Sequence, residues 1–470
     1  ICSREFGGSK ALLELAKGIG LPEALYSQKE WWVDSVLAMI IGRLLYAGSK
    51  LSLSHQQANT ALWELCGISE KVDVDKHCYE ALDELLKRQQ NIQKKLAERH
   101  LEQGQLILYD ITSSYLEGEY KDNPLVQFGY NRDGKRGHKQ IVVGLLCNAK
   151  GCPFGVEVFS GNTQDSKTVL EKVEEIREQY KLAEVVFVGD RGMITRANAK
   201  VLKTQQGLRT ISALTHLQIT ELLKRGEIEL NLFKENEIVE VIDSQDRSER
   251  YMLCCNPLMK RKEGATREAL LACTIKELER IAGNKRKRKA EKIGATVGRV
   301  LKRYKTGKFI EWKVEQGNLE WSIKEEAKEK EVAMDGCYII RSDVSPEVMS
   351  KEQVVSNYKN LQAVERAFRS LKTVHLELRP IYHHKEERIR AHVFLCMLAF
   401  YLQWHMEKRL EPLFKTNKEG KERRWTVRAV IERLQTIRTE KISMGEVQFE
   451  QITQPDDEQR YILELLGVSL

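Results

Sequence analysis

Apolar residues recur at two different periods along the chain, and the change of period divides it into regions. Within 35–48 and 79–100 they return every three or four positions, which is the spacing of one helical face. From residue 105 the runs become β-rich and are separated by Gly, Asn and Asp turns: 105–118, 138–151 and 152–162. The pattern predicts a helical N-terminal domain over 1–100, followed by a meander of three strands.

Strands and helices alternate after the meander. A helix over 165–182, a strand over 184–190, a helix over 195–206 and a strand over 209–214 follow one another. Three strands and then this alternation imply one mixed sheet with helices on its faces. The sequence therefore predicts an α/β core whose first part covers 101–214.

The sheet pattern stops near residue 215 and resumes near 336. The segment between them is charged and contains short alternating stretches such as 310–326. The run GCYIIRSD then begins a new strand, and a helix over 358–372 follows. Three segments complete the expected organisation: a β-rich insertion domain over 215–335, the second part of the core over 336–410, and a helical C-terminal region over 411–470.

Composition and charge narrow the class of protein. The 470 residues exceed the size of one core, so about two to four domains are expected. A chain with 42% hydrophobic and 31% charged residues is neither disordered nor embedded in a membrane. From Lys260 to Lys308 there are 17 basic and 5 acidic residues, a local charge of +12 that leaves −4 of the total +8 for the remainder. One segment therefore accounts for the basic character.

Cysteine usage and the N-terminus indicate a reducing compartment. The ten cysteines include no C-x-x-C pair, which argues against a disulfide framework or a zinc site and favours reduced thiols. No secretory signal precedes the first helix, and because the chain starts at Ile1 rather than Met, we expect a preceding piece to be missing. The longest apolar helix, 391–404, has about fourteen residues and is too short to span a bilayer. We expect a cytoplasmic protein without a membrane partner.

The helix over 358–372, YKNLQAVERAFRSLK, has an acid among several bases. At 3.6 residues per turn, four of its residues fall within about 60° of one another on one stripe: Tyr358, Glu365, Arg369 and Lys372. The ordinary interpretation is a solvated face with charge pairs worth roughly 0.2–0.5 kcal/mol each. The alternative is a functional stripe in which the acid holds a metal and the bases contact phosphates.

Two aspartates favour the functional alternative. Asp110 lies inside the apolar strand LILYDIT, where an ionised acid is costly unless it is paired. Asp190 ends the apolar strand VVFVGD, and α/β sheets place their sites at such strand ends. Each alone is compatible with a turn or cap residue, but together with Glu365 they can converge on one end of the sheet. Carboxylates are the ligands that Mg²⁺ prefers, and two such ions can promote phosphoryl transfer.

A second polar cluster gives a weaker signal. His383 and His384 stand next to acidic residues, and these residue types can bind a metal. The neighbouring Lys385 and Arg388 favour an exposed turn instead.

Short motifs surround the two aspartates. YDITSSYLEG contains Asp110, VGDRGM contains Asp190, and GYNRDGKRGHKQ and GNTQDSKT lie between them. With these motifs, and with its helix at the spacing Tyr-x2-Arg-x3-Glu-x6-Lys, the chain resembles the bacterial insertion-sequence transposases of the DDE class over roughly 35–408. Leu361 stands where that family has Arg, and Arg369 on the same stripe is the candidate to replace it.

The resemblance implies a fold and an activity. Members with an inserted β-rich domain have the layout seen here, with 80 residues from Asp110 to Asp190 and 175 from Asp190 to Glu365. It implies a ribonuclease-H-like core in which these three acids bind two Mg²⁺ ions, with Mn²⁺ as a substitute. It further implies hydrolysis at the element's ends and attack of the freed 3′-hydroxyl on target DNA, with metal rather than a side-chain base activating each nucleophile.

The implied partner is double-stranded DNA, both as terminal inverted repeats and as target. Because two ends must be cut together, we expect a homodimer in a paired-end complex, associated with the bacterial nucleoid. The N-terminal domain is a further candidate to contact DNA. A solvated charge run is the alternative for the basic segment. The candidate DNA-binding residues are Tyr358, Arg369 and Lys372 on the helix and Lys285, Arg286, Lys287, Arg288, Lys289, Arg299, Lys302 and Arg303 in that segment.

Two tryptophans and two rival functions stay open. Some relatives stack a flipped base on an insertion-domain Trp, for which Trp312 and Trp321 are the candidates, and the alternative is packing within a sheet. One rival function is a DNA-binding protein descended from a transposase and no longer catalytic. The other is a metal-dependent nuclease of the same fold without strand transfer. Joined products with short target duplications distinguish these functions, since a nuclease makes none.

Overall fold

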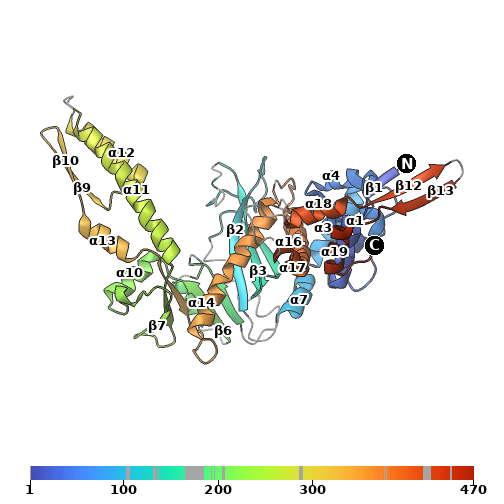
Figure 1. The fold of residues 1–470 in the computed structure, drawn as a ribbon, viewed down its shortest axis with the longest axis horizontal. Helices are drawn as coiled ribbons and strands as arrows, with labels where there is room; N and C mark the ends of the chain where they lie inside the picture. The colour runs from blue at the N-terminus through green and yellow to red at the C-terminus, as the bar shows by residue number, and fades with distance from the viewer. Residues whose placement is uncertain are drawn as a thin grey trace. The chain divides into compact units, whose positions relative to one another are not determined.

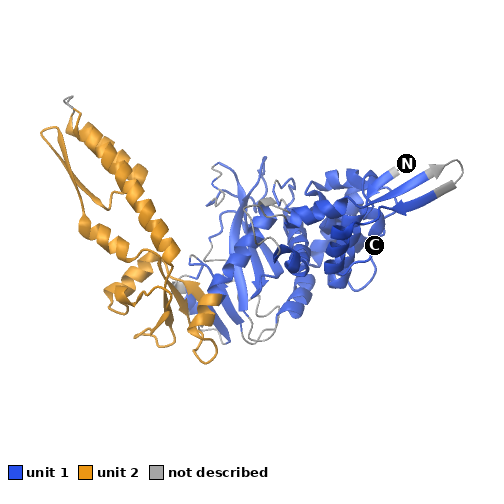
Figure 2. Cartoon of the chain, in the orientation of Figure 1, with its two compact units in different colours: residues 1–210, 357–470 blue, residues 211–356 orange. Residues whose placement is uncertain are grey.

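The chain forms two compact units (Figure 2). Unit 1 comprises Ile1–Thr210 and Asn357–Leu470, and unit 2 comprises Ile211–Ser356, so unit 2 is inserted into the sequence of unit 1. The predicted helix over 165–182 lies outside the described residues. The computed structural model describes residues 2–101, 106–130, 134, 137–164, 185–191, 193–194, 196–203, 207–284, 289–374, 376, 378–379, 381–415, 425–444 and 447–470.

The N-terminal part of unit 1 is helical apart from one strand. The apolar pattern over 35–48 forms most of α3, whose residues from Val36 to Leu45 are buried. The pattern over 79–100 forms a π-helical turn and two helices that break at Arg88. The helices are α1 (Gly7–Gly18), α2 (Leu21–Leu25), α3 (Trp31–Tyr46), α4 (Lys50–His55), α5 (Leu62–Leu65), α6 (Ala81–Lys87) and α7 (Gln89–His100).

The predicted mixed sheet is confirmed (Figure 1). Its strand order is β4-β3-β2-β5-β6-β11-β8-β7, in which β2 pairs antiparallel with β3 and parallel with β5. Every residue of β3 is buried, because helices cover the sheet. The first strands of this core along the chain are β2 (Leu106–Tyr115), β3 (Gln140–Asn148), β4 (Pro153–Ser160), β5 (Val185–Gly189) and β6 (Leu208–Ala213), and the helix α9 (Arg196–Lys203) lies between β5 and β6 in the sequence.

The predicted insertion contains strands, but its longest elements are helices. α11 (Pro257–Ala282) and α12 (Ala290–Tyr304) run side by side (Figure 1), and the hairpin of β9 (Ile310–Glu315) and β10 (Asn318–Ile323) packs on them. Few apolar residues form the stripe of α12, so the surrounding charges masked its helical period. The other elements are α10 (His216–Lys224), β7 (Val239–Ile242), β8 (Arg250–Cys255), α13 (Glu325–Ala333) and β11 (Cys337–Ser342).

The C-terminal region, predicted as helical, also contains a hairpin. β12 (Arg438–Met444) pairs with β13 (Val447–Ile452) and with β1 (Cys2–Glu5), so the two ends of the chain share a three-stranded sheet. Because β1 and β12 lie near opposite ends of the chain, their pairing leaves no local signal in the sequence. The helices of the C-terminal region are α17 (Glu411–Lys415), α18 (Val427–Gln435) and α19 (Asp457–Leu466), and those of the preceding segment 336–410 are α14 (Lys351–Lys359), α15 (Leu361–Arg369) and α16 (Glu386–Arg409).

The apolar helix predicted over 391–404 lies within α16 and belongs to the core. Its residues from Ala391 to Gln403 are buried, and it packs against α3, α6 and β4. Among the helices that the structure describes, none is by itself long and apolar enough to cross a bilayer. Only when two neighbouring segments, Trp31–Tyr46 and Lys50–Ala58, are taken together are they long and apolar enough, and the chain bends by 93° between them.

Candidate carboxylate site

Asp110 and Asp190 occupy matching positions on neighbouring strands. The parallel pairing of β2 with β5 sets Leu108 opposite Val188, and Asp110 and Asp190 each follow one of these paired residues by two positions. Paired strands lie about 4.8 Å apart, and residues in register point to the same face. Asp110 is half-buried and Asp190 is exposed. The two acids therefore stand at corresponding positions just past the paired part of β2 and β5.

The segment 358–372, which contains the predicted acidic residue Glu365, is attached to β2 and to Asp190 at two points. The Tyr358 hydroxyl donates a hydrogen bond to Asp190 Oδ1 at 3.3 Å, and Lys372 Nζ donates to Thr112 Oγ1 at 2.6 Å. Thr112 lies two residues after Asp110, hence on the same face of β2. Burial, with the charge of Asp190, raises the pKa of Tyr358, so its hydroxyl stays protonated and able to donate.

Glu365 lies midway between these two contacts. It is seven residues from both Tyr358 and Lys372, a distance of about 10.5 Å along a helix in each direction. α15 packs against β2, and the Glu365 side chain is exposed. In the sequence, Glu365 therefore stands between the residue that contacts Asp190 and the residue that contacts Thr112.

The predicted single helix is irregular at both ends of this stripe. α14 ends at Lys359, Asn360 forms a turn, and α15 passes into a π-helical turn over Ser370–Val374. Such π turns often occur at functional sites. Lys372 lies in this turn and is only 9% exposed, so its side chain points into the unit. No local pattern indicates the π turn, because the apolar spacing of this segment resembles that of an α-helix.

Arg369 and Leu361 have different surroundings from Glu365. Arg369 is exposed and lines a groove of about 470 Å³ together with Lys150, Arg366 and Trp404. Leu361, which replaces the family Arg, is 8% exposed and packs inside the unit. An arginine at this position would have to leave that packed position to reach a phosphate.

The other predicted DNA-binding residues belong to unit 2. Lys289, Arg299, Lys302 and Arg303 are all exposed, and the three on α12 lie away from its buried apolar stripe. Lys285, Arg286, Lys287 and Arg288, also predicted to bind DNA, lie outside the described residues. A solvated helix face and a phosphate-binding face both fit this exposure.

The two tryptophans are direct cross-strand partners in the β9–β10 hairpin. Trp321 packs on the core formed by α11 and α12. Trp312 is 38% exposed, and its ring lies next to Gly294 of α12. Sheet packing therefore accounts for Trp321, whereas Trp312 has surface available for another aromatic ring.

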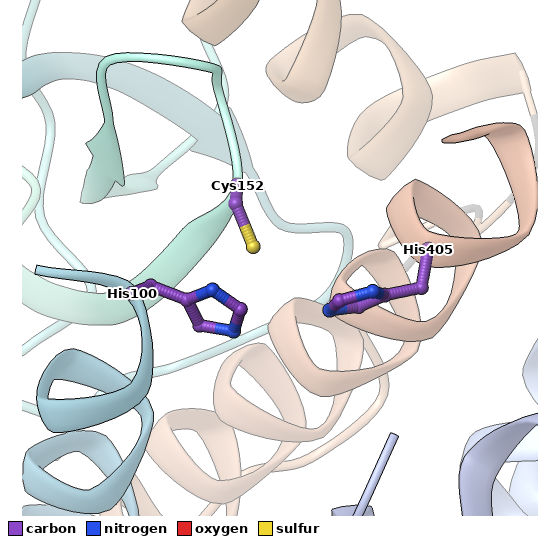
Figure 3. Close-up of side chains that lie close together, drawn as sticks. All are labelled: His100, Cys152 and His405. Carbon is purple, nitrogen blue, oxygen red and sulfur yellow. The ribbon is translucent and has the colours of Figure 1, made fainter. Parts of the chain in front are cut away.

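A group of metal-ligating side chains that the sequence did not predict lies elsewhere in unit 1 (Figure 3). Ligand atoms of His100, Cys152 and His405 all lie within 4.8 Å of one another. This donor set suits zinc or a similar transition metal rather than Mg²⁺. However, the Tyr401 hydroxyl is hydrogen-bonded to His100 Nε2 at 2.8 Å, and burial, His100 and Arg409 lower the pKa of His405 to about 4. The residues come from three distant segments, so no spacing motif indicated them.

The fold is that of an α/β protein built on a mixed eight-stranded sheet. The family model described as a transposase DDE domain matches residues 102–402, which is more than half of the chain. The chain therefore belongs to the DDE-domain transposase family, a family that uses divalent metal ions.

Solved structures are also similar to this chain. The chain is similar to a piggyBac transposase in a synaptic complex with hairpin DNA, at 9% identity and a TM-score of 0.41, over 91% of this chain and 76% of that chain. No curated protein matches the chain.

Proposed function

We propose that this transposase cuts DNA at the ends of an insertion sequence and joins the freed 3′-hydroxyl to target DNA. The observation that supports this most is the parallel pairing of β2 with β5, because Asp110 and Asp190 both lie two residues beyond its last paired residues. The contacts of Tyr358 with Asp190 and of Lys372 with Thr112 support a place for Glu365 near the same face. Three acids on one face, next to buried and exposed bases, suit a charged phosphodiester substrate better than a neutral one.

The three carboxyl groups fit a Mg²⁺ site, with Mn²⁺ as a substitute. Their donors are all oxygen atoms, and Asp190 and Glu365 are exposed, so bound ions can keep water ligands. When two ions are bound, they activate the attacking oxygen and stabilise the leaving oxygen of the phosphodiester. The donor chemistry therefore favours hard divalent cations over zinc.

The residues around the acids prepare the site. Neighbouring carboxylates repel one another, and the Lys372 ammonium beside Thr112 offsets part of that repulsion. The Tyr358 hydroxyl holds one oxygen of Asp190, which leaves Oδ2 for another ligand. Tyr358 and Lys372 thus act as positioning residues for the acids in this proposal.

DNA contacts and assembly extend the proposal. The exposed bases of α12 would bind phosphates, and each contact would add to the salt dependence of affinity. Trp312 would supply an aromatic face for a flipped base. Because both ends of an element must be cut, a homodimer holding the two terminal repeats is the proposed active assembly.

Removing divalent metal is expected to abolish cleavage while DNA binding persists. Purified protein is mixed with labelled duplex carrying the repeats that flank its gene, in a chelating buffer or with added Mg²⁺. Nicked or cut product should form only with Mg²⁺ or Mn²⁺, because without metal the acids cannot stabilise the phosphoryl transfer. Anisotropy measured in both buffers checks binding. Equal cleavage in the chelating buffer would contradict a metal-dependent mechanism.

A nuclease without strand transfer is the second candidate, and Leu361 favours it. With leucine in place of arginine, the stripe that would hold the end DNA has one basic side chain fewer. Cutting needs the end DNA to stay bound for a shorter time than joining does. The two candidates differ in product: a transposase yields end DNA joined to a target plasmid, whereas the nuclease yields cut ends alone.

A further inference from the structure

A pocket in unit 1 is lined by basic side chains and contains no acid. It has a volume of about 200 Å³ and lies between α3, the loop before α4, residues 379–383 and α16. None of the described residues that line it is Asp or Glu. The five nitrogen-bearing side chains among them are Arg43, Lys50, Arg379, His383 and His392.

The innermost basic groups are buried without an opposite charge. Arg43 and Lys50 are each 8% exposed, and neither forms an ion pair with any carboxylate that the structure describes. Arg43 donates to the Gly48 carbonyl oxygen and lies 3.3 Å from His392 Nε2, while Lys50 Nζ contacts His392 Nδ1. The Arg43 Nε is buried and has no hydrogen-bond partner among the residues that the structure describes. Burying such charges costs several kcal/mol per ion unless they are paired.

Apart from burial, the largest effects on the pKa values of Lys50 and His383 come from positive neighbours. Burial, and then the charge of Arg43, lowers the pKa of Lys50 to about 7. Burial, and then Lys50 and other basic neighbours, lowers the pKa of His383 to about 3. The field in the pocket therefore disfavours every added proton, and it would favour an anion.

The pocket opens to solvent next to the strand that contains Asp110. Tyr382 at its mouth is 67% exposed. The guanidinium of Arg379, also at the mouth, lies 4.8 Å from the ring centre of Tyr115, the last residue of β2. An anion can thus enter from outside, on the unit that contains the carboxylate site.

We propose that this pocket binds a phosphate group. An oxyanion with several acceptor oxygens can accept from the Arg43 fork and the Lys50 ammonium at once, as arginine–phosphate pairs do. Its charge would balance the two bases that lack a carboxylate. The phosphate comes either from a DNA backbone or from free phosphate in solution. This inference does not depend on DNA cleavage, and His383, predicted to lie in an exposed turn, becomes part of a binding site.

Thermal unfolding of the full chain tests the proposal. In a metal-free buffer at constant ionic strength, inorganic phosphate should raise the melting temperature of the wild type by several degrees and saturate, whereas chloride should not. Lys50→Gln should melt higher than the wild type without phosphate, because one uncompensated buried charge is gone, and should lose the phosphate response. Lys71→Gln removes an exposed lysine and should respond like the wild type.

A mouth variant and DNA complete the test. Arg379 is half-buried, and its replacement in Arg379→Gln keeps the inner pocket intact. This variant should raise the phosphate concentration at the midpoint of the titration about tenfold, the effect of losing one charged hydrogen bond. If saturating duplex DNA also raises that midpoint, the phosphate is a DNA phosphate, and an unchanged midpoint assigns the pocket to free phosphate. The proposal is overturned if chloride reproduces the phosphate effect, or if Lys50→Gln and Arg379→Gln respond like the wild type.

Discussion

Replacing Asp110 with Asn is expected to lower cleavage of the end DNA by at least about 100-fold, because loss of an outer-shell partner of a metal ligand already costs about 10–100-fold. The amide keeps the shape of the side chain and its Oδ1, which accepts from the Ile111 amide at 2.8 Å. Only the negative charge is lost, so the fold should persist. Initial rates of nicking at saturating Mg²⁺ measure the effect, and Asp190→Asn should behave in the same way.

The matched control is Asp122→Asn, which removes the charge of an exposed aspartate of the same unit. Its rate should equal that of the wild type, and all the proteins should share one melting temperature and one affinity for DNA. Cleavage by Asp110→Asn within about tenfold of the wild-type rate would show that this residue is not a metal ligand.

Replacing Gly161 with Ala is expected to destabilise unit 1 by about 3 kcal/mol, at the upper end of overpacking effects. A Cβ atom at this position would lie 2.0 Å from the Gln140 carbonyl oxygen and 2.5 Å from that of Gln127. Both oxygens accept backbone hydrogen bonds in the bridge between Gln127 and Gln140. The backbone therefore cannot yield without breaking that bridge. Chemical denaturation followed by circular dichroism measures the change.

Gly18→Ala is the matched control for this substitution. Gly18 is the last residue of α1, and a Cβ there would meet only the end of the flexible Arg409 side chain at 3.5 Å. The variant should be as stable as the wild type, or more stable by up to about 1 kcal/mol, since alanine is the better helix former. A Gly161→Ala protein as stable as Gly18→Ala would refute the close packing at Gly161.

The strands and the two aspartates were predictable because their signals are local. Alternation with turn residues marks β2, β3 and β4 without any knowledge of their partners. Asp110 and Asp190 are conspicuous as charges at the centre and the end of apolar strands. The helix spacing indicated Tyr358, Glu365 and Lys372 for a related reason, since 3.6 residues per turn brings them to one face.

The features that escaped prediction depend on contacts between distant segments. The pairing of β1 with β12 joins the two ends of the chain, and His100, Cys152 and His405 come from three separate elements. α12 was missed because its few apolar residues lie among many charges. Local sequence also gives no indication that His383 lies in the pocket next to Lys50, since its neighbours in the chain, Tyr382 and His384, are exposed.

The most direct test of the three-acid account is excision in cells, with a marker placed between the chromosomal ends that flank this gene. Wild type and Glu365→Gln are expressed at equal levels, and rejoined donor DNA is counted. The account predicts excision by the wild type and none by the variant, since the amide cannot replace the third carboxylate. Excision by Glu365→Gln at the wild-type frequency would contradict the account.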